Sequence, residues 1–392
     1  MAENKTPLRA SALRFVLLMG LVSLLADVTY EGARSLAGPY LQLLGASAAV
    51  VAATAGLGEL VGYALRLVSG WLTDRTGRHW LIAIIGYAVN LLAVPMLAWA
   101  GRWEIAVMLL ILERLGKAVR APARDVMLSH ATKNLGTGWG FGIHEALDQI
   151  GGVTGPVLMA AVLFYKNDYR FGFALLLAPA LLALTVLLIG RAIYPRPREF
   201  EPATPRIGAR GYQREYWIYL VAVGLIAAGF ADFPLIAFHL KKNALAPDEW
   251  IPLFYALAMG VDAIAALVFG RLFDKFGLPV LAAAALISAL FAPLVFFGGF
   301  GLALFGMALW GVGMGAQESI MKAAVAEMVP AERRGAAYGL FNAGYGLAWF
   351  LGSAAMGLMY DWSLAALVVF SVAAQAAAIP LILFVRSRDR NP

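Results

Sequence analysis

The sequence contains no cysteine. Disulfide bonds and thiolate metal sites are therefore excluded, and the redox environment of the protein leaves no mark on its composition. The histidines are few and scattered, and the pair His144 and Glu145 lacks the second histidine of a zinc-binding HExxH motif. We therefore expect no bound metal.

Motifs for nucleotide binding and nucleophilic catalysis are also missing. The chain has no GxxxxGK[ST] loop to hold phosphates and no GxSxG turn to present a nucleophilic serine. Transport driven directly by ATP, from this chain alone, is disfavoured. Since no group of catalytic side chains is apparent, we expect neither an enzyme nor a cofactor.

Charged residues are scarce, at 14% of the chain, whereas hydrophobic residues make up 61% and the mean hydropathy is +0.75. An average soluble domain has about 25% charged and about 45–50% apolar residues. Crossing the hydrocarbon layer of a membrane takes about 20 apolar residues in a helix. Apolar stretches of suitable length predict an all-α membrane protein with twelve transmembrane helices, at residues 12–43, 47–72, 80–100, 104–129, 138–165, 171–194, 215–240, 249–272, 278–298, 301–328, 334–359 and 363–386.

The formal net charge of +7 raises the question of nucleic-acid binding. The basic residues, however, follow the predicted loops. If the N-terminus is cytoplasmic, most of the loop and tail Lys and Arg lie on the inner side, and the outer loops hold only Arg102, Lys166, Arg170, Lys241 and Lys242. This asymmetry is the positive-inside pattern. It predicts a multi-pass membrane protein with both termini in the cytoplasm, surrounded by lipid and not bound to nucleic acid. We expect the membrane to be a prokaryotic inner membrane.

The chain divides into two similar halves. Its longest polar segment is rich in Pro and Arg and predicts a cytoplasmic linker at residues 195–214, between six-helix halves at 1–194 and 215–392. An internal repeat supports this division, because GWLTDRTG from Gly70 returns as GRLFDKFG from Gly270. Paired halves with a binding site between them at mid-membrane are a common transporter plan.

The repeated segment resembles the loop signature of the major facilitator superfamily, between helices 2 and 3, with a weaker copy between helices 8 and 9. The resemblance covers essentially the whole chain and implies a monomeric secondary transporter of small molecules that works by alternating access. It also implies that this segment is a cytoplasmic gate that latches one half against the other, although a plain positive-inside turn would have the same charges. The gating residues are Gly70, Asp74, Arg75, Gly77, Arg78 and Asp274.

Charges inside the predicted helices are a second functional signal. A charged side chain at the bilayer centre costs at least about 2.5–3.5 kcal/mol and is expected to be paired or to face a wet cavity. On helix 1, Asp27 and Glu31 lie one turn apart on one face, which also holds Arg34. On helix 4, bases recur at helical spacing. We expect the two faces to pair, either as a fixed ion-pair network or as a titratable cavity.

The titratable interpretation assigns proton coupling to Asp27 and Glu31, with Glu145 on helix 5 as a second carrier. His144 is interpreted as a hydrogen-bonded packing residue. Bases outnumber carboxylates on helices 1 and 4, so an anionic substrate group or a protonated acid would balance the charge. The predicted substrate cavity comprises Arg34, Arg114, Lys117, Arg120, Asp232, Gln317, Glu318 and Lys322.

Helix 5 contains IGGVTGPVL, in which Gly151, Gly155 and Pro156 resemble part of the antiporter signature of the same superfamily. Close helix packing through small residues is the alternative interpretation. The titratable carboxylates, the surplus bases and the antiporter-like residues together predict a proton-coupled exporter of a small organic solute, amphiphilic or anionic. Uptake or exchange of an organic anion is the alternative, and a membrane-embedded enzyme or lipid-handling protein is the alternative from a different class.

Overall fold

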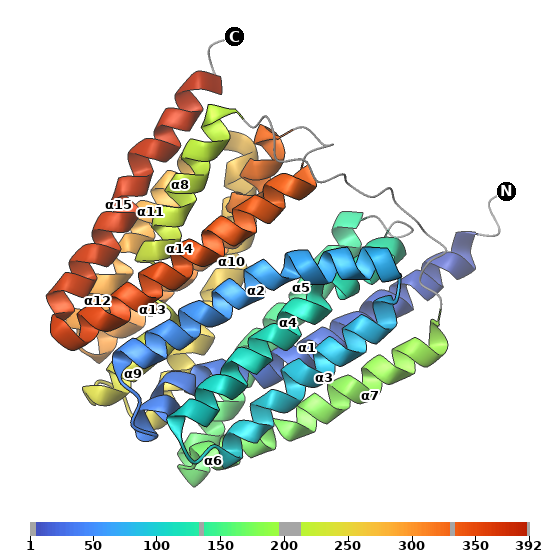
Figure 1. The fold of residues 1–392 in the computed structure, drawn as a ribbon, viewed down its shortest axis with the longest axis horizontal. Coiled ribbons are helices and arrows are strands. Elements are labelled where there is room, and N and C mark those ends of the chain that lie inside the picture. The colour runs from blue at the N-terminus through green and yellow to red at the C-terminus, as the bar shows by residue number, and fades with distance from the viewer. Residues whose placement is uncertain (1–4, 133–136, 196–212, 330–333, 390–392) are drawn as a thin grey trace. The chain divides into compact units, whose positions relative to one another are not determined.

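The computed structural model describes residues 5–132, 137–195, 213–329 and 334–389 of the 392-residue chain, and these ranges contain helices but no strand. Figure 1 shows the helices in chain order. They are α1 (Lys5–Leu43), α2 (Ala48–Thr76), α3 (His79–Met96), η1 (Leu97–Trp99), α4 (Trp103–Thr132), α5 (Thr137–Lys166), α6 (Tyr169–Leu175), α7 (Leu177–Ile193), α8 (Arg214–Gly229), α9 (Phe233–Lys242), η2 (Asp248–Trp250), α10 (Ile251–Phe276), α11 (Pro279–Ala289), α12 (Phe291–Phe297), α13 (Phe300–Met328), α14 (Arg334–Trp362) and α15 (Leu364–Asp389).

The predicted fold class is confirmed. Within the described ranges, 10 spans are long and apolar enough to cross a membrane. The helices α4 and α14, with 30 and 29 residues, have the length of the remaining two predicted segments. Several predicted segments are each built from two consecutive helices, such as α6 with α7, α8 with α9 and α11 with α12. The chain is therefore an all-α, multi-pass membrane protein.

The segment predicted as one helix at 215–240 is interrupted at residues 230–232, between α8 and α9. The carbonyl oxygen of Gly229 accepts a hydrogen bond from the Ser371 hydroxyl at 2.6 Å, and that of Ala231 accepts one from the Trp310 indole at 2.9 Å. Asp232 then caps α9 by accepting from the backbone N–H of Phe233. Backbone groups released by the break are thus paired by side chains, as a membrane interior requires.

The repeated signature segment is more helical than the sequence pattern predicts. The last turns of α2 run to Thr76, so Gly70 lies inside a helix and only the two residues Gly77 and Arg78 separate α2 from α3. Gly77 has φ +60° and its N–H bonds the carbonyl oxygen of Thr73 at 2.8 Å, the geometry of a glycine that ends a helix. In the second copy, Gly277 has φ +69° and ends α10 in the same way.

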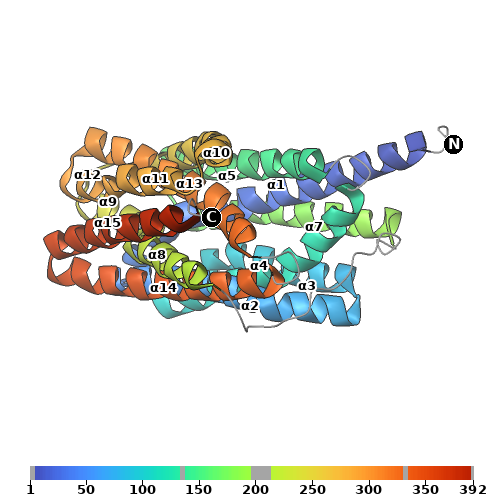
Figure 2. The same ribbon diagram turned by 90° about the horizontal axis from the view of Figure 1, so that it is seen from above.

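The helices form two packing units. The first contains residues 1–34 and 65–204, and the second contains residues 35–64 and 205–392. Both α1 and α2 are therefore divided, each contributing one part to each unit. In the second unit, α8 packs beside α14 and α15, as Figure 1 and the perpendicular view in Figure 2 both show. In the first unit, α3 packs along α4.

Candidate functional site

One face of α1 places four polar side chains inside the first packing unit. Ser23, Asp27, Tyr30 and Glu31 are spaced by three or four residues or are neighbours on this face, and each is buried. Asp27 is 6% exposed and Glu31 is 8% exposed. Since both are carboxylates in a membrane-spanning helix, the charges that surround them decide what they can do.

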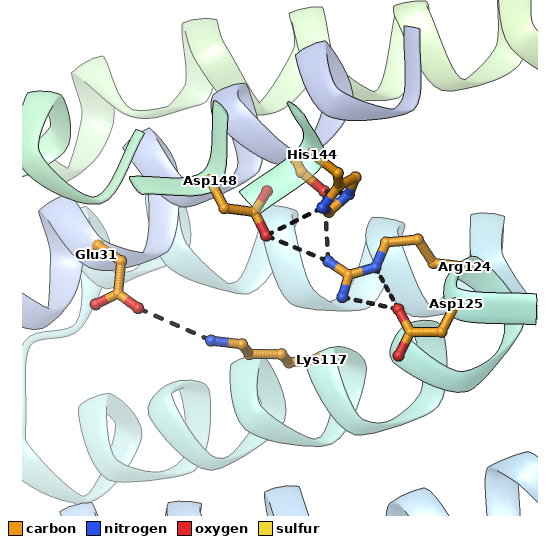
Figure 3. Close-up of polar contacts among 7 residues, drawn as sticks. Glu31, Lys117, Arg124, Asp125, His144 and Asp148 are labelled. Carbon is orange, nitrogen blue, oxygen red and sulfur yellow. Dashed lines mark hydrogen bonds and ion pairs between the residues drawn. The ribbon is translucent and has the colours of Figure 1, made fainter. Parts of the chain in front are cut away.

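A base of α4 lies beside Glu31, as expected from the sequence. The Lys117 ammonium lies 3.8 Å from a carboxylate oxygen of Glu31 (Figure 3). It also lies 3.9 Å from the centre of the Tyr30 ring. Asp27 also interacts electrostatically with Lys117 and with Asp148 of α5. A single ammonium group therefore serves two carboxylates of α1 at once.

A second network joins α1, α4 and α5 (Figure 3). The hydroxyl of Ser23 and the Nε2 atom of His144 share a hydrogen bond of 2.9 Å, and Nδ1 of His144 lies 3.6 Å from Asp148. Arg124 reaches Asp148 at 3.8 Å and is held more tightly by its neighbour Asp125 at 2.9 Å. His144 thus makes the hydrogen bond expected of a packing histidine, and it also touches an acid of the network.

A buried acid of α4, Glu113, has its own partners. Glu113 is 6% exposed, and its carboxylate accepts a hydrogen bond of 2.7 Å from the side-chain amide of Asn90 on α3. The same amide reaches the backbone carbonyl of Glu113 at 3.0 Å, and Arg114 lies 3.3 Å from the other carboxylate oxygen. Glu113 is therefore held by fixed contacts within α3 and α4.

Three predicted site residues differ in their surroundings from the rest of the cluster. Glu145 is exposed at the surface of α5, whereas Asp148, three residues further on, takes part in the network. Arg34 is half-buried one turn beyond Glu31. Arg120 is only 1% exposed and lies between the rings of Tyr30 and Tyr87.

The glycines of α5 are in direct contact with α1. A methyl group built on Gly151 would lie 2.5 Å from the carbonyl oxygen of Leu24 and 2.8 Å from Cβ of Asp27. One built on Gly155 would lie 2.6 Å from the carbonyl oxygen of Val28. These contacts are those of close helix packing, and they bring α5 against the acidic face of α1. Pro156 follows inside the same helix.

In the second packing unit, two predicted cavity residues are buried and engaged. Asp232 caps α9, and its second carboxylate oxygen accepts a hydrogen bond of 3.3 Å from the indole of Trp349. The side-chain oxygen of Gln317 accepts one of 2.8 Å from the Tyr345 hydroxyl. Glu318 and Lys322 are exposed on α13. These residues belong to a different unit from the charge cluster, and the described residues contain no group of three or more acids and histidines suited to a metal.

The predicted gating residues lie at the ends of α2 and α10. Gly70 faces Pro122 of α4, whose Cβ would be 3.7 Å from a methyl group at that position. Arg75 and Arg78 are exposed, and the Arg75 guanidinium lies over the Trp71 ring. Asp274 is exposed at the end of α10. The side chain of Asp74 lies outside what the structure describes.

Several residues of the cluster were not selected from the sequence, namely Ser23, Tyr30, Asn90 and Asp148. For Ser23 and Tyr30 a signal was present, because both share a helical face with Asp27. Asp148 lies three residues before Gly151 and seven before Gly155, so it shares the helical face of the two glycines that contact α1. Asn90 lies in an apolar helix with no charged neighbour, and only the packing of α3 on α4 reveals its role.

Comparison with known proteins gives one consistent result. The family profile described as the Major Facilitator Superfamily matches residues 16–315 and 249–392. An uncharacterised protein of Mycobacterium tuberculosis is 40% identical over 385 residues, which cover 96% of this chain and 94% of that protein. An uncharacterised MFS-type transporter of Methanocaldococcus jannaschii is 24% identical over 269 residues, 67% of each chain.

Solved structures have the same fold at low sequence identity. The nucleoside transporter NupG superposes with a TM-score of 0.75 at 12% identity, covering 96% of this chain and 100% of that one. A bacterial homologue of the iron transporter ferroportin superposes with a TM-score of 0.70 at 16% identity, covering 96% and 99%. At such identities the likeness extends to the fold alone.

Proposed function

The chain belongs to the Major Facilitator Superfamily and is a secondary transporter rather than an enzyme, and from this premise we propose that it couples protons to the movement of a small organic anion. The observation that carries the proposal is the state of Asp27. Its Oδ1 atom is buried and has no hydrogen-bond partner among the described residues. The carboxylate is hydrogen-bonded to Tyr30 and keeps one buried oxygen unpaired, beside a base shared with Glu31, so it is suited to gain and lose a proton.

The proton sites are Asp27 and Glu31. Loss of the proton from Asp27 leaves a negative charge that draws in Lys117, and uptake of the proton releases the ammonium toward Glu31. Glu145, the second carrier predicted from the sequence, is exposed, and Asp148 on the same helix is in electrostatic contact with Asp27. We propose Asp148 as the group through which a proton leaves or reaches Asp27 along α5.

The substrate's charge follows from the bases of α4. Lys117, Arg120 and Arg124 occupy one helical face that points toward α1 and α5. Bases concentrated in the interior of a membrane protein favour an anionic solute.

The division of α1 and α2 supports alternating access. The boundary between packing units falls between Arg34 and Ser35 of α1, one turn after Glu31. Beyond it, Gly38 contacts Pro234 of α9, and Gly56 of α2 contacts Ser353 of α14. A charge change at Glu31 therefore acts on a helix at the point where it passes from one unit to the other. Rocking of units about a central site is the usual mechanism of such transporters.

The proposed gate lies at the other end of α2. Asp74, Arg75, Gly77 and Arg78, with Asp274 in the second copy, would latch the cytoplasmic ends of the two halves and release them in turn. In support of this, each segment ends a helix at a glycine with positive φ, which fixes where the chain turns and where the bases stand. We place both termini in the cytoplasm and the protein, as a monomer, in a prokaryotic inner membrane.

The proposed direction is export. It depends on the antiporter-like residues Gly151, Gly155 and Pro156, and the first two make contacts that packing alone explains. Since packing alone explains these contacts, they do not require export. Uptake or exchange of an organic anion, which the buried bases favour, is therefore the second candidate. Both candidates share the proton site.

The test is a transport screen in proteoliposomes containing the purified protein, with an imposed pH gradient and a panel of organic anions, cations and neutral amphiphiles. The proposal predicts that one or more organic anions accumulate in response to the gradient, with the direction distinguishing export from uptake. Transport of cations or neutral solutes only, or transport that is indifferent to the gradient, would contradict it.

A further inference from the structure

Arg120 occupies an unusual position among the bases of α4. Its side chain is 1% exposed, and its guanidinium carbon lies 4.3 Å from the centre of the Tyr87 ring and 5.6 Å from that of Tyr30. The arginine is thus enclosed between α3 and α1 at the middle of the first packing unit. Contact with an aromatic face offsets about 0.5–2 kcal/mol of the cost of burying such a charge.

Close packing of α3 on α4 fixes this arrangement. A methyl group built on Gly86 would lie 2.6 Å from the backbone nitrogen of Arg120, and one built on Gly116 would overlap the backbone nitrogen of Asn90. The two glycines therefore allow the helix backbones to approach closely on both sides of Tyr87. The ring and the guanidinium face each other because no side chain separates the helices there.

The other bases of α4 have acidic partners, but Arg120 does not. Arg114 lies on Glu113, Lys117 on Glu31, and Arg124 on Asp125 and Asp148. In the described part of the chain, no carboxylate is within ion-pair distance of Arg120, and its Nε and Nη1 atoms are buried without hydrogen-bond partners. The hydroxyl of Tyr87 is also buried without one.

The energetic cost of burying Arg120 in this way indicates that its side chain binds a further group. A buried guanidinium that has N–H groups without acceptors and no acid at ion-pair distance is destabilised by several kcal/mol, more than one or two aromatic contacts return. Water molecules could pair with the free N–H and O–H groups, but they bring no charge. An anion supplies both the acceptors and the charge. Because Arg120 also interacts electrostatically with Asp27 and Asp148, an anion with more than one negative charge would be repelled.

We propose that Arg120 and Tyr87 bind one small monoanionic group, with Lys117 contributing positive charge from the next turn of α4. The ligand chemistry is that of a carboxylate or a halide. If the group is the carboxylate of the transported solute, the inference rests on the proposed function and identifies where that solute is held. If it is a halide, the site holds a resident inorganic ion and is independent of transport.

The experiment measures binding without transport. The purified full chain in detergent is unfolded thermally in sodium salts of acetate, benzoate and chloride at constant ionic strength, with gluconate, too bulky for an enclosed site, as the balancing anion. We expect one of the small anions to raise the unfolding temperature saturably. Arg120→Gln should lose at least tenfold in apparent affinity, and Tyr87→Phe, which keeps the ring, should lose several-fold.

The matched control is Arg102→Gln, because Arg102 is exposed and pairs with Glu104 at the start of α4. It removes the same charge just before the start of α4 and should leave the anion effect unchanged. Response to acetate or benzoate identifies a carboxylate site, and response to chloride alone identifies a halide site. The inference is overturned if no small anion raises the unfolding temperature of the natural protein saturably. It is also overturned if Tyr87→Phe and Arg120→Gln both bind the anion with the affinity of the natural protein. Since no gradient is used, either result is independent of whether proton coupling holds.

Discussion

Replacing Gly151 with alanine tests the contact between α5 and α1 on which the site depends. The added methyl group would lie 2.5 Å from the Leu24 carbonyl oxygen and 2.8 Å from Cβ of Asp27. Neither atom belongs to a flexible side-chain end, so one helix must move. The adjacent Gly152 has no neighbour within 4 Å of the same position and provides a matched control in the same helix.

The magnitude follows from two opposing contributions. Alanine in place of a helical glycine favours the helix by about 1 kcal/mol at either position. Forcing an extra methyl group into a packed contact costs about 1–3 kcal/mol. Gly152→Ala should therefore be more stable than the natural protein by up to about 1 kcal/mol, and Gly151→Ala between unchanged and about 2 kcal/mol less stable.

The assay is reversible unfolding of the two variants and the natural protein in mixed micelles, followed by proton-driven transport of a substrate found in the screen. Because the methyl group also presses on Asp27, Gly151→Ala should lose most of its coupled transport, while Gly152→Ala retains it. If the two variants have equal stability and equal transport, the close contact between α1 and α5 is wrong.

Three further changes probe other parts of the molecule. Asp74→Asn should impair transport far more than membrane insertion, since it removes a gating acceptor and leaves the helices intact, and normal transport by the well-folded variant would exclude the latch. Asn90→Leu should lower stability by about 1–3 kcal/mol, because the Glu113 carboxylate and carbonyl lose their shared donor, and unchanged unfolding would show that this pair is not formed. Tyr345→Phe keeps the ring and removes the hydrogen bond that its hydroxyl donates to Gln317, so stability should fall by about 1–3 kcal/mol, and a variant as stable as the natural protein would contradict this bond.

The twelve membrane segments were predictable because a membrane interior leaves the backbone few choices. Every N–H and C=O in lipid must be paired within the chain, so a long apolar stretch becomes a helix. The break before α9 was not predicted, although Asp232 followed by Pro234 has the pattern of a helix N-cap with an early proline. The sequence also did not predict that the repeated signature segment is largely helical. Polar residues indicate where a helix leaves the lipid, but the helix can continue beyond that point.

The candidate site was predicted in part. Helical spacing placed Asp27 and Glu31 on one face and the bases of α4 on another, and the Lys117–Glu31 contact joins them as expected. The choice between Glu145 and Asp148 depended on the rotation of α5, which the contact of Gly151 with α1 sets. Among the described residues, Arg120 has no acid at ion-pair distance because of how α1, α3 and α4 pack together. The spacing of residues within one helix does not predict this packing.

The central claim is that Asp27 couples the proton to the substrate. The most direct measurement compares Asp27→Asn with the natural protein in vesicles, recording substrate counterflow without a gradient alongside accumulation driven by a pH gradient. Asparagine keeps the size of the side chain and removes its titration, so counterflow should persist while accumulation disappears. Accumulation equal to that of the natural protein would contradict the account and assign the proton elsewhere, and loss of both activities would make Asp27 structural.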